Sequence, residues 1–202
     1  MNYPSTIKNL IECYKKLPGV GEKTAERYAL ATLYLDQQII DLYSKSIKNV
    51  KSKIKRCLKC NNLSENDHCD ICNDESRDKN TVCIVEQPKN VILFEKIGSY
   101  NGQYHVLDGL ISPLDGINPE NIKIDLLLER IKKDNIKEVI IAVKPSIEGE
   151  TTALYILKLL EGMNITVSKI AHGVPMGAEM EYIDSLTLEM ALEGRKKISK
   201  DS

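Results

Sequence analysis

The chain has 202 residues, enough for one large domain or two small ones. It contains no Trp and one Phe, so its core must be largely aliphatic. No apolar run approaches the ~20 residues that a membrane span needs, and the N-terminus lacks a signal-peptide apolar region. We therefore expect a cytoplasmic protein, in which the six cysteines are thiols or metal ligands rather than disulfides.

The charge of the chain is unevenly distributed. Residues 1–56 hold eleven Lys or Arg and five Asp or Glu, a net charge of +6, and the remainder carries −7. A basic front part and an acidic back part suggest an anionic partner for the front. An ordinary solvated helical surface is the alternative interpretation.

Apolar residues at helical spacing predict three helices in the basic part, over residues 6–16, 22–35 and 38–54. Ser5 is the expected N-cap of the first helix, and Cys13 and Cys83 are expected core residues because their neighbours are apolar. The outer face of the third helix carries a series of lysines that could follow phosphates: Lys45, Lys48, Lys51, Lys53 and Lys55.

A glycine-rich turn, Leu17-Pro18-Gly19-Val20-Gly21, separates the first two helices and resembles the hairpin of helix-hairpin-helix DNA-binding modules. Gly19 and Gly21 permit close backbone approach, and the amides at the start of the second helix would point at an anion such as phosphate. Lys23 and Arg27 are four residues apart and share one helix face beside the hairpin. Such contacts predict DNA binding that is independent of sequence, although an ordinary turn between helices remains the alternative.

Four cysteines form two closely spaced Cys-x-x-Cys pairs, Cys57/Cys60 and Cys69/Cys72. Zn²⁺ prefers a tetrahedral set of sulfur ligands, and the segment between Cys57 and Asn80 has too few large apolar residues to fold on its own core. A disulfide pair, idle thiols, iron–sulfur ligation and a ligand role for His68 are the alternatives. We expect Lys55, Arg56 and Lys59 to balance part of the −2 charge of a four-thiolate zinc site. With four protein ligands the zinc would be structural, and we expect it to fix the angle between the two halves of the chain.

Beyond Asn80, short Val- and Ile-rich runs alternate with helical patterns, which predicts a parallel α/β sheet. The predicted strands are residues 81–86, 104–107, 139–143 and 165–170. The predicted helices cover residues 91–96, 124–133, 150–162 and 185–196.

Three carboxylates follow strand ends in this region. Glu86 ends the first strand, and Glu148 and Glu150 follow the strand that ends at Val143. If these strands are neighbours, the three side chains lie in one crevice, which resembles the Toprim domain of primases and topoisomerases, where carboxylates hold Mg²⁺. Here the second motif is Glu-x-Glu rather than Asp-x-Asp, so Mg²⁺ binding would be weak, and stabilisation of the helix N-terminus is an equal alternative.

The order of these features resembles the RecR family of bacterial recombination mediators over essentially the whole chain. Further landmarks are the segments 109–116, 147–153, 173–177 and 181–195. The resemblance implies an α/β fold class with four parts: a helix-hairpin-helix module (1–56), a C4 zinc finger (57–80), a Toprim domain (81–175) and a C-terminal oligomerisation segment (176–202).

The resemblance also implies a non-enzymatic, ring-shaped homotetramer that binds single- and double-stranded DNA at the nucleoid. With RecO and RecF it would load RecA onto single strands. Lys23 and Arg27 match family positions implicated in DNA contact, and Glu86, Glu148 and Glu150 match the surface that contacts RecO. Lys144, Lys169 and His172 depart from the residues expected in many members. A Mg²⁺-dependent nuclease or primase is the alternative function.

Overall fold

The computed structural model describes residues 3–171 and 173–195, so His172 lies outside the described residues. The chain forms two compact units, Met1–Ile54 and Lys55–Ser202. None of the helices in the described ranges has the length and apolar character that crossing a membrane requires.

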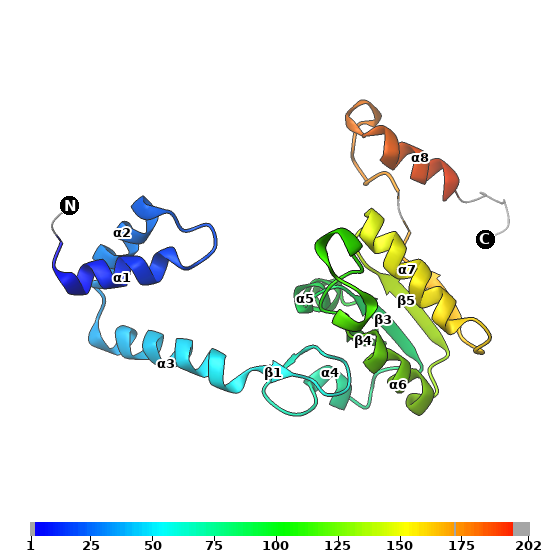
Figure 1. The fold of residues 1–202 in the computed structure, drawn as a ribbon, viewed down its shortest axis with the longest axis horizontal. Coiled ribbons are helices and arrows are strands. Elements are labelled where there is room, and N and C mark those ends of the chain that lie inside the picture. The colour runs from blue at the N-terminus through cyan, green and yellow to red at the C-terminus, as the bar shows by residue number, and fades with distance from the viewer. Residues whose placement is uncertain (1–2, 172, 196–202) are drawn as a thin grey trace. The chain divides into compact units, whose positions relative to one another are not determined.

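The first unit consists of three helices, α1 (Ser5–Lys15), α2 (Glu22–Thr32) and α3 (Gln37–Lys53), as predicted to within a few residues (Figure 1). Helices α1 and α2 pack around Ile11, Ala25 and Ala29. Small alanines on α2 allow the two helices to approach closely. Helix α3 buries none of its residues.

Two expectations for α1 are wrong. Its N-cap is Pro4, whose carbonyl accepts the Ile7 and Lys8 amides, so Ser5 is the first helical residue. Cys13 is exposed, because the buried side of α1 is formed by Ile11 and its helical neighbours. Cys83 is buried as expected, and this burial raises the pKa of its thiol to about 12.

The second unit is built on a parallel four-stranded sheet in the order β4-β3-β5-β6. The strands are β3 (Thr81–Val85), β4 (Gln103–Val106), β5 (Glu138–Ala142) and β6 (Thr166–Lys169). The connecting helices are α5 (Pro88–Ile97), α6 (Ile124–Asp134) and α7 (Ile147–Leu160). Short 3-10 turns at Pro113–Asp115 and Pro119–Asn121 precede α6, and Met180–Tyr182 precedes α8 (Ser185–Glu193).

Each face of the sheet is covered by different helices (Figure 1). Alternation along β3 sends Val82 and Ile84 toward the core beneath α6 and α7, and sends Cys83 and Val85 toward the core beneath α5. The sheet is therefore buried on both faces, which explains its continuous Val and Ile runs. Strands β3 and β5 are neighbours, as the predicted grouping of the carboxylates after these strands requires.

A fully buried histidine on the edge strand β4 predicts a pH dependence of stability. His105 donates from Nε2 to the Lys123 carbonyl at 2.7 Å, and burial lowers the pKa of its imidazole to about 4. The unfolded imidazole, with a pKa of about 6.5, binds the proton first as the pH falls. The free energy of unfolding should therefore decrease by on the order of 3 kcal/mol between the unfolded and folded pKa values.

A His105→Gln variant keeps an amide donor but does not titrate in this range. Urea unfolding as a function of pH should show a shallower acid slope for this variant than for the wild type. Identical slopes would show that His105 is not a source of acid sensitivity.

Candidate nucleic-acid interface and zinc centre

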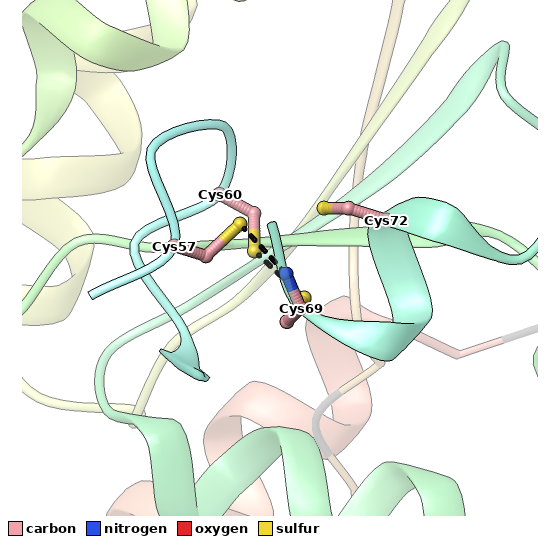
Figure 2. Close-up of side chains that lie close together, drawn as sticks. All are labelled: Cys57, Cys60, Cys69 and Cys72. Carbon is pink, nitrogen blue, oxygen red and sulfur yellow. Dashed lines mark hydrogen bonds between the residues drawn. The ribbon is translucent and has the colours of Figure 1, made fainter. Parts of the chain in front are cut away.

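The four cysteines predicted as zinc ligands lie together in the structure. Cys57 and Cys60 come from the turn after β1 (Lys55–Arg56), which pairs with β2 (Leu63–Ser64). Figure 2 shows Cys69 just before the short helix α4 (Asp70–Asn73), as its N-cap, and Cys72 within that helix. The four Sγ atoms all lie within 4.8 Å of one another, and all four cysteines are free thiols.

This arrangement fits a Zn²⁺ ion. Four thiolates at Zn–S bonds of about 2.3 Å form a tetrahedron with sulfur–sulfur edges of roughly 3.8 Å. The Sγ atoms of Cys60 and Cys69 are 3.5 Å apart, and the Cys69 amide donates to Cys57 Sγ at 3.3 Å. Hydrogen bonding between the thiols lowers the pKa of Cys57 and raises the pKa of Cys60, a conflict that a cation removes by stabilising every thiolate.

The ligand set has no open position, so the zinc is structural rather than catalytic. His68 is exposed beside Cys69 and is not part of the cluster. The basic residues expected to balance part of the charge of the zinc site also form ion pairs with aspartates. These pairs are Lys55–Asp67, Arg56–Asp108 and Lys59–Asp134.

The zinc finger covers the edge strand of the sheet. The Cys60 carbonyl accepts the Val106 amide at 2.9 Å, and the Asn61 side chain donates to the Val106 carbonyl at 3.0 Å. Asn61 is buried with a left-handed φ of 60°, a conformation that asparagine tolerates better than most residues. The finger thereby satisfies backbone groups that an edge strand would otherwise expose.

A buried cation, Arg130 of α6, connects the finger to the sheet. Its guanidinium donates to the Tyr104 carbonyl at 2.6 Å and to the Gln103 side chain. Its Nε lies 3.5 Å from an Asp134 carboxylate oxygen, and Lys59 of the finger lies 2.7 Å from the same oxygen. The turn between Cys57 and Cys60, which carries Lys59, is thus linked electrostatically to β4 through Asp134 and Arg130 of α6.

Sequence reasoning missed Arg130, Asp134 and Gln103. Arg130 looks like a surface residue of an amphipathic helix, and no motif identifies it. A weak signal was available, because Arg130 adjoins the apolar positions Leu127 and Ile131 on the buried side of α6.

The hairpin between α1 and α2 has the predicted geometry. Gly19 has a φ of +78°, and the Val20 amide donates to the Leu17 carbonyl at 3.1 Å to close the turn. Gly21 is the N-cap of α2 without a capping side chain, and the first intrahelical bond runs from the Ala25 amide to the Gly21 carbonyl. The amides of residues 22–24 are therefore the donors that a helix N-terminus offers to a ligand.

Two cations are exposed beside these amides. Lys23 and Arg27 lie on the exposed surface of α2, and the Arg27 guanidinium sits 5.5 Å from the ring centroid of Tyr28. This cation–π contact helps to hold the guanidinium at the surface. Lys15 is not a comparable free cation, because it forms ion pairs with Glu12 at 2.8 Å and with Glu22 at 2.7 Å.

The three carboxylates at the strand ends have separate surroundings. Glu148 accepts the Ser146 hydroxyl at 2.6 Å, which lowers the pKa of Glu148, whereas both Glu150 oxygens lie 2.8 Å from Lys169 Nζ. Glu86 lines a hollow of about 290 Å³ on the α5 side of the strand ends. In the described part of the chain, the cysteines form the one cluster of three or more such side chains tight enough for a metal ion. The carboxylates therefore do not fit a shared Mg²⁺.

The first turn of α7 requires glycine at position 149. The Ser146 hydroxyl accepts the Gly149 amide at 3.2 Å, which caps the helix, and a Cβ at residue 149 would overlap the Lys144 carbonyl oxygen. Gly149→Ala should therefore lower the free energy of unfolding by about 1–3 kcal/mol, because a backbone atom has to move. Urea denaturation measures this, with Gly173→Ala as a control because its Cβ would meet open space. A Gly149→Ala protein as stable as the control would contradict the argument.

Comparison with known proteins agrees with this organisation. Family models match for the RecR helix-hairpin-helix at residues 7–49, the RecR zinc finger domain with four cysteines at 54–74, the Toprim domain at 80–171 and the RecR C-terminal region at 173–196. Recombination protein RecR of Lactobacillus johnsonii is 47% identical over 196 residues, which cover 96% of this chain and 98% of that protein.

The fold and the cysteine site together define a zinc-finger protein with a helix-hairpin-helix module and a Toprim domain. The identity of 47% to the Lactobacillus johnsonii protein over nearly the whole of both chains makes the assignment more specific. The chain belongs to the RecR family of recombination proteins.

Proposed function

We propose that the chain is a non-enzymatic DNA-binding protein of recombinational repair. The observation that carries this proposal is the hairpin, where the open N-terminus of α2 and two exposed cations, Lys23 and Arg27, lie together. Gly19 and Gly21 leave open space around the turn, since a Cβ at either position would meet no neighbouring atom. A phosphate backbone can approach such a surface closely, and the contact carries no base information.

A second basic surface supports DNA as the ligand. Helix α3 exposes four lysines, and within the described ranges none of them forms an ion pair with an acidic residue. These residues are Lys45, Lys48, Lys51 and Lys53. Unpaired lysines along one helix can release condensed counterions from DNA, so binding should weaken steeply with salt for both single and double strands.

Homo-oligomerisation is supported by an apolar stripe on α3. Ile40, Tyr43, Ile47, Val50 and Ile54 recur at alternating steps of three and four residues, the a/d spacing of helix pairing. Each is at least partly exposed, and Ile47 and Val50 are 67% and 65% exposed. Helix α8 likewise buries none of its residues. We propose that copies of the chain associate through their N- and C-terminal parts into a ring-shaped tetramer that holds DNA.

Membership of the RecR family supports a further part of the proposal. RecO and RecF are the proposed protein partners, and loading of RecA onto single-stranded DNA is the proposed outcome. Glu86, Glu148 and Glu150 are the proposed RecO-facing surface, and each side chain is partly accessible. This role would place the protein at the nucleoid.

Removing both hairpin cations tests the DNA-binding proposal. A protein with Lys23→Ala and Arg27→Ala should bind DNA at least about tenfold more weakly at moderate salt, because two phosphate contacts are lost. The slope of log affinity against log salt should fall by about 1.8 for duplex DNA and about 1.4 for single strands. Fluorescence anisotropy with labelled oligonucleotides at several salt concentrations measures both quantities.

A charge-matched control is available on α6. Lys132 and Lys133 are exposed and lie in the other compact unit, so Lys132→Ala with Lys133→Ala removes the same charge away from the hairpin. This control should bind DNA with nearly the wild-type slope. Equal losses in the two double variants would show that net charge, rather than the hairpin, determines affinity.

A further inference from the structure

An exposed aromatic side chain, Tyr34, lies just beyond the C-terminal end of α2, in the same compact unit as the hairpin. Its side chain is 88% exposed. We propose that the Tyr34 ring is a stacking platform for an unpaired base of single-stranded DNA. The inference rests on the proposed phosphate contacts of Lys23 and Arg27, and it adds a preference for single strands that these cations alone do not provide.

The helical backbone places Tyr34 on the same face as the two cations. Residues of α2 advance by about 100° each, so Lys23 and Arg27 lie about 40° apart around the helix axis. Beyond Thr32 the helix tightens into a 3-10 turn, in which the Tyr34 amide donates to the Ala31 carbonyl at 3.1 Å. Steps of about 100–120° therefore bring Tyr34 back to within about 20° of Arg27.

The distance along this face suits a nucleic acid strand. The rise from Arg27 to Tyr34 is roughly 11 Å, which is about the length of three stacked nucleotides at ~3.4 Å each. Between the two lies Ala31, which is exposed and small, so a strand can follow the face without meeting a long side chain there. A phosphate at the cations and a base at the ring can thus belong to one strand.

Tyr34 is not occupied by the protein itself. Among the residues that the structure describes, none forms a hydrogen bond with its hydroxyl or a ring or cation–π contact with its ring. Tyr28 differs, because its ring packs edge-on against Tyr14 at a centroid distance of 5.7 Å and also carries the Arg27 guanidinium. One exposed aromatic ring is ordinary on a protein surface. Its alignment with two cations is what indicates a ligand that carries both phosphates and bases.

The carboxylates of α2 are engaged elsewhere. Glu22 forms an ion pair with Lys15 at 2.7 Å, and Glu26 accepts a hydrogen bond from the Tyr3 hydroxyl. The face that carries the two cations and the aromatic ring is therefore favourable for an anionic strand.

Only an unpaired base can use this platform. In a duplex the base faces are stacked on one another, and a protein reaches only the base edges in the grooves. In a single strand a base face is accessible, and an aromatic ring stacks on it with little regard to sequence because every base has a π-face. Duplex DNA would thus contact the cations alone, and single-stranded DNA would contact the cations and Tyr34.

Tyr34→Leu tests the proposal because leucine keeps an apolar side chain but lacks a π-face. In the full-length, zinc-loaded protein, this variant should bind a labelled single-stranded oligonucleotide at least about fivefold more weakly than the wild type. Its affinity for a duplex and its salt slope should not change, because the phosphate contacts remain. Tyr34→Phe keeps the ring and should bind single strands within about twofold of the wild type. Fluorescence anisotropy measures all of these affinities.

Two controls separate stacking from other effects. Tyr182 is also a highly exposed tyrosine, 81% exposed, but it lies in the other compact unit, so Tyr182→Leu should leave both affinities unchanged. A single strand with abasic sites keeps its phosphates and offers no base to a ring. Wild type and Tyr34→Leu should therefore bind this abasic strand equally well.

The absence of tryptophan from the sequence allows a direct measurement of stacking. Tyr34→Trp introduces a single tryptophan at the proposed platform. Saturating single-stranded DNA should quench its fluorescence, because a stacked base lies against the indole, whereas duplex DNA and the abasic strand should not.

Three outcomes would overturn the proposal. They are wild-type affinity of Tyr34→Leu for single strands, an equal loss of affinity for single strands and duplex, and a loss of self-association by Tyr34→Leu in native mass measurement. The last would make Tyr34 a contact between copies of the chain. Failure of the underlying hairpin proposal is distinguishable, because it would appear as unchanged duplex binding in the Lys23→Ala, Arg27→Ala protein.

Discussion

Replacing Cys60 with serine is expected to release the zinc ion and destabilise the second compact unit. A bound Zn²⁺ supplies roughly 10–16 kcal/mol in isolated finger peptides, and three thiolates with a hydroxyl form a much weaker site. The finger has little core of its own, since its buried cluster consists of the four ligands with Ile71 packed against them. Without the metal, the turn that carries Cys60 and Asn61 loses its shape and no longer covers Val106 on β4.

Zinc content by mass spectrometry and thermal unfolding by circular dichroism measure this effect. Cys13→Ser is the matched control, because Cys13 is an exposed thiol outside the cluster, and it should retain one zinc per chain and wild-type stability. A Cys60→Ser protein that also retains its zinc and its unfolding temperature would show that the finger does not depend on this ligand.

Replacing Arg130 with methionine is expected to lower the free energy of unfolding by about 3 kcal/mol. Removing one partner of a buried charged network typically costs about 3–5 kcal/mol, because the other partners stay buried without their counterpart. Here the Gln103 side chain and the Tyr104 carbonyl lose a hydrogen-bond donor. Asp134 loses one ion-pair partner and keeps Lys59. The expected loss is therefore at the lower end of that range.

Urea denaturation of the zinc-loaded protein gives the free energy directly, with Lys133→Met as the control on the same helix. Lys133 is exposed, and its replacement should change stability by about 0.5 kcal/mol or less. If Arg130→Met were no less stable than Lys133→Met, the network would not hold the finger, α6 and β4 together.

The finger lies in the same compact unit as the sheet, because the boundary between units falls between Ile54 and Lys55. The order of the features along the chain predicts that the finger fixes the angle between a basic half and an acidic half, and this stays a prediction. The contacts of the finger with Val106 and Asp134 give the zinc a role in completing the α/β domain.

Local patterns account for the parts that were predicted correctly. Two Cys-x-x-Cys pairs place four ligands through short-range geometry, and Gly19 and Gly21 determine a turn of a few residues. Continuous Val and Ile runs identified the buried strands because a parallel sheet is covered on both faces. Helix α7 begins three residues earlier than predicted, because Ser146 caps it and Gly149 can approach Lys144.

Long-range pairing explains what could not be predicted. The partners of Lys59 and Lys169 are Asp134 and Glu150, which lie far away in the sequence, and neither pair follows from periodicity or spacing. The sequence could predict that carboxylates follow adjacent strand ends. It could not show that Glu148 would accept from Ser146 or that Lys169 of β6 would pair with Glu150.

Native mass measurement with and without an oligonucleotide is the most direct test of assembly. It shows whether copies of this chain associate through N- and C-terminal surfaces to hold DNA. We predict a homo-oligomer with a mass of four chains and four zinc ions, and a complex in which one DNA molecule is bound by the whole assembly. A monomer that keeps its zinc and binds DNA one chain at a time would contradict this account.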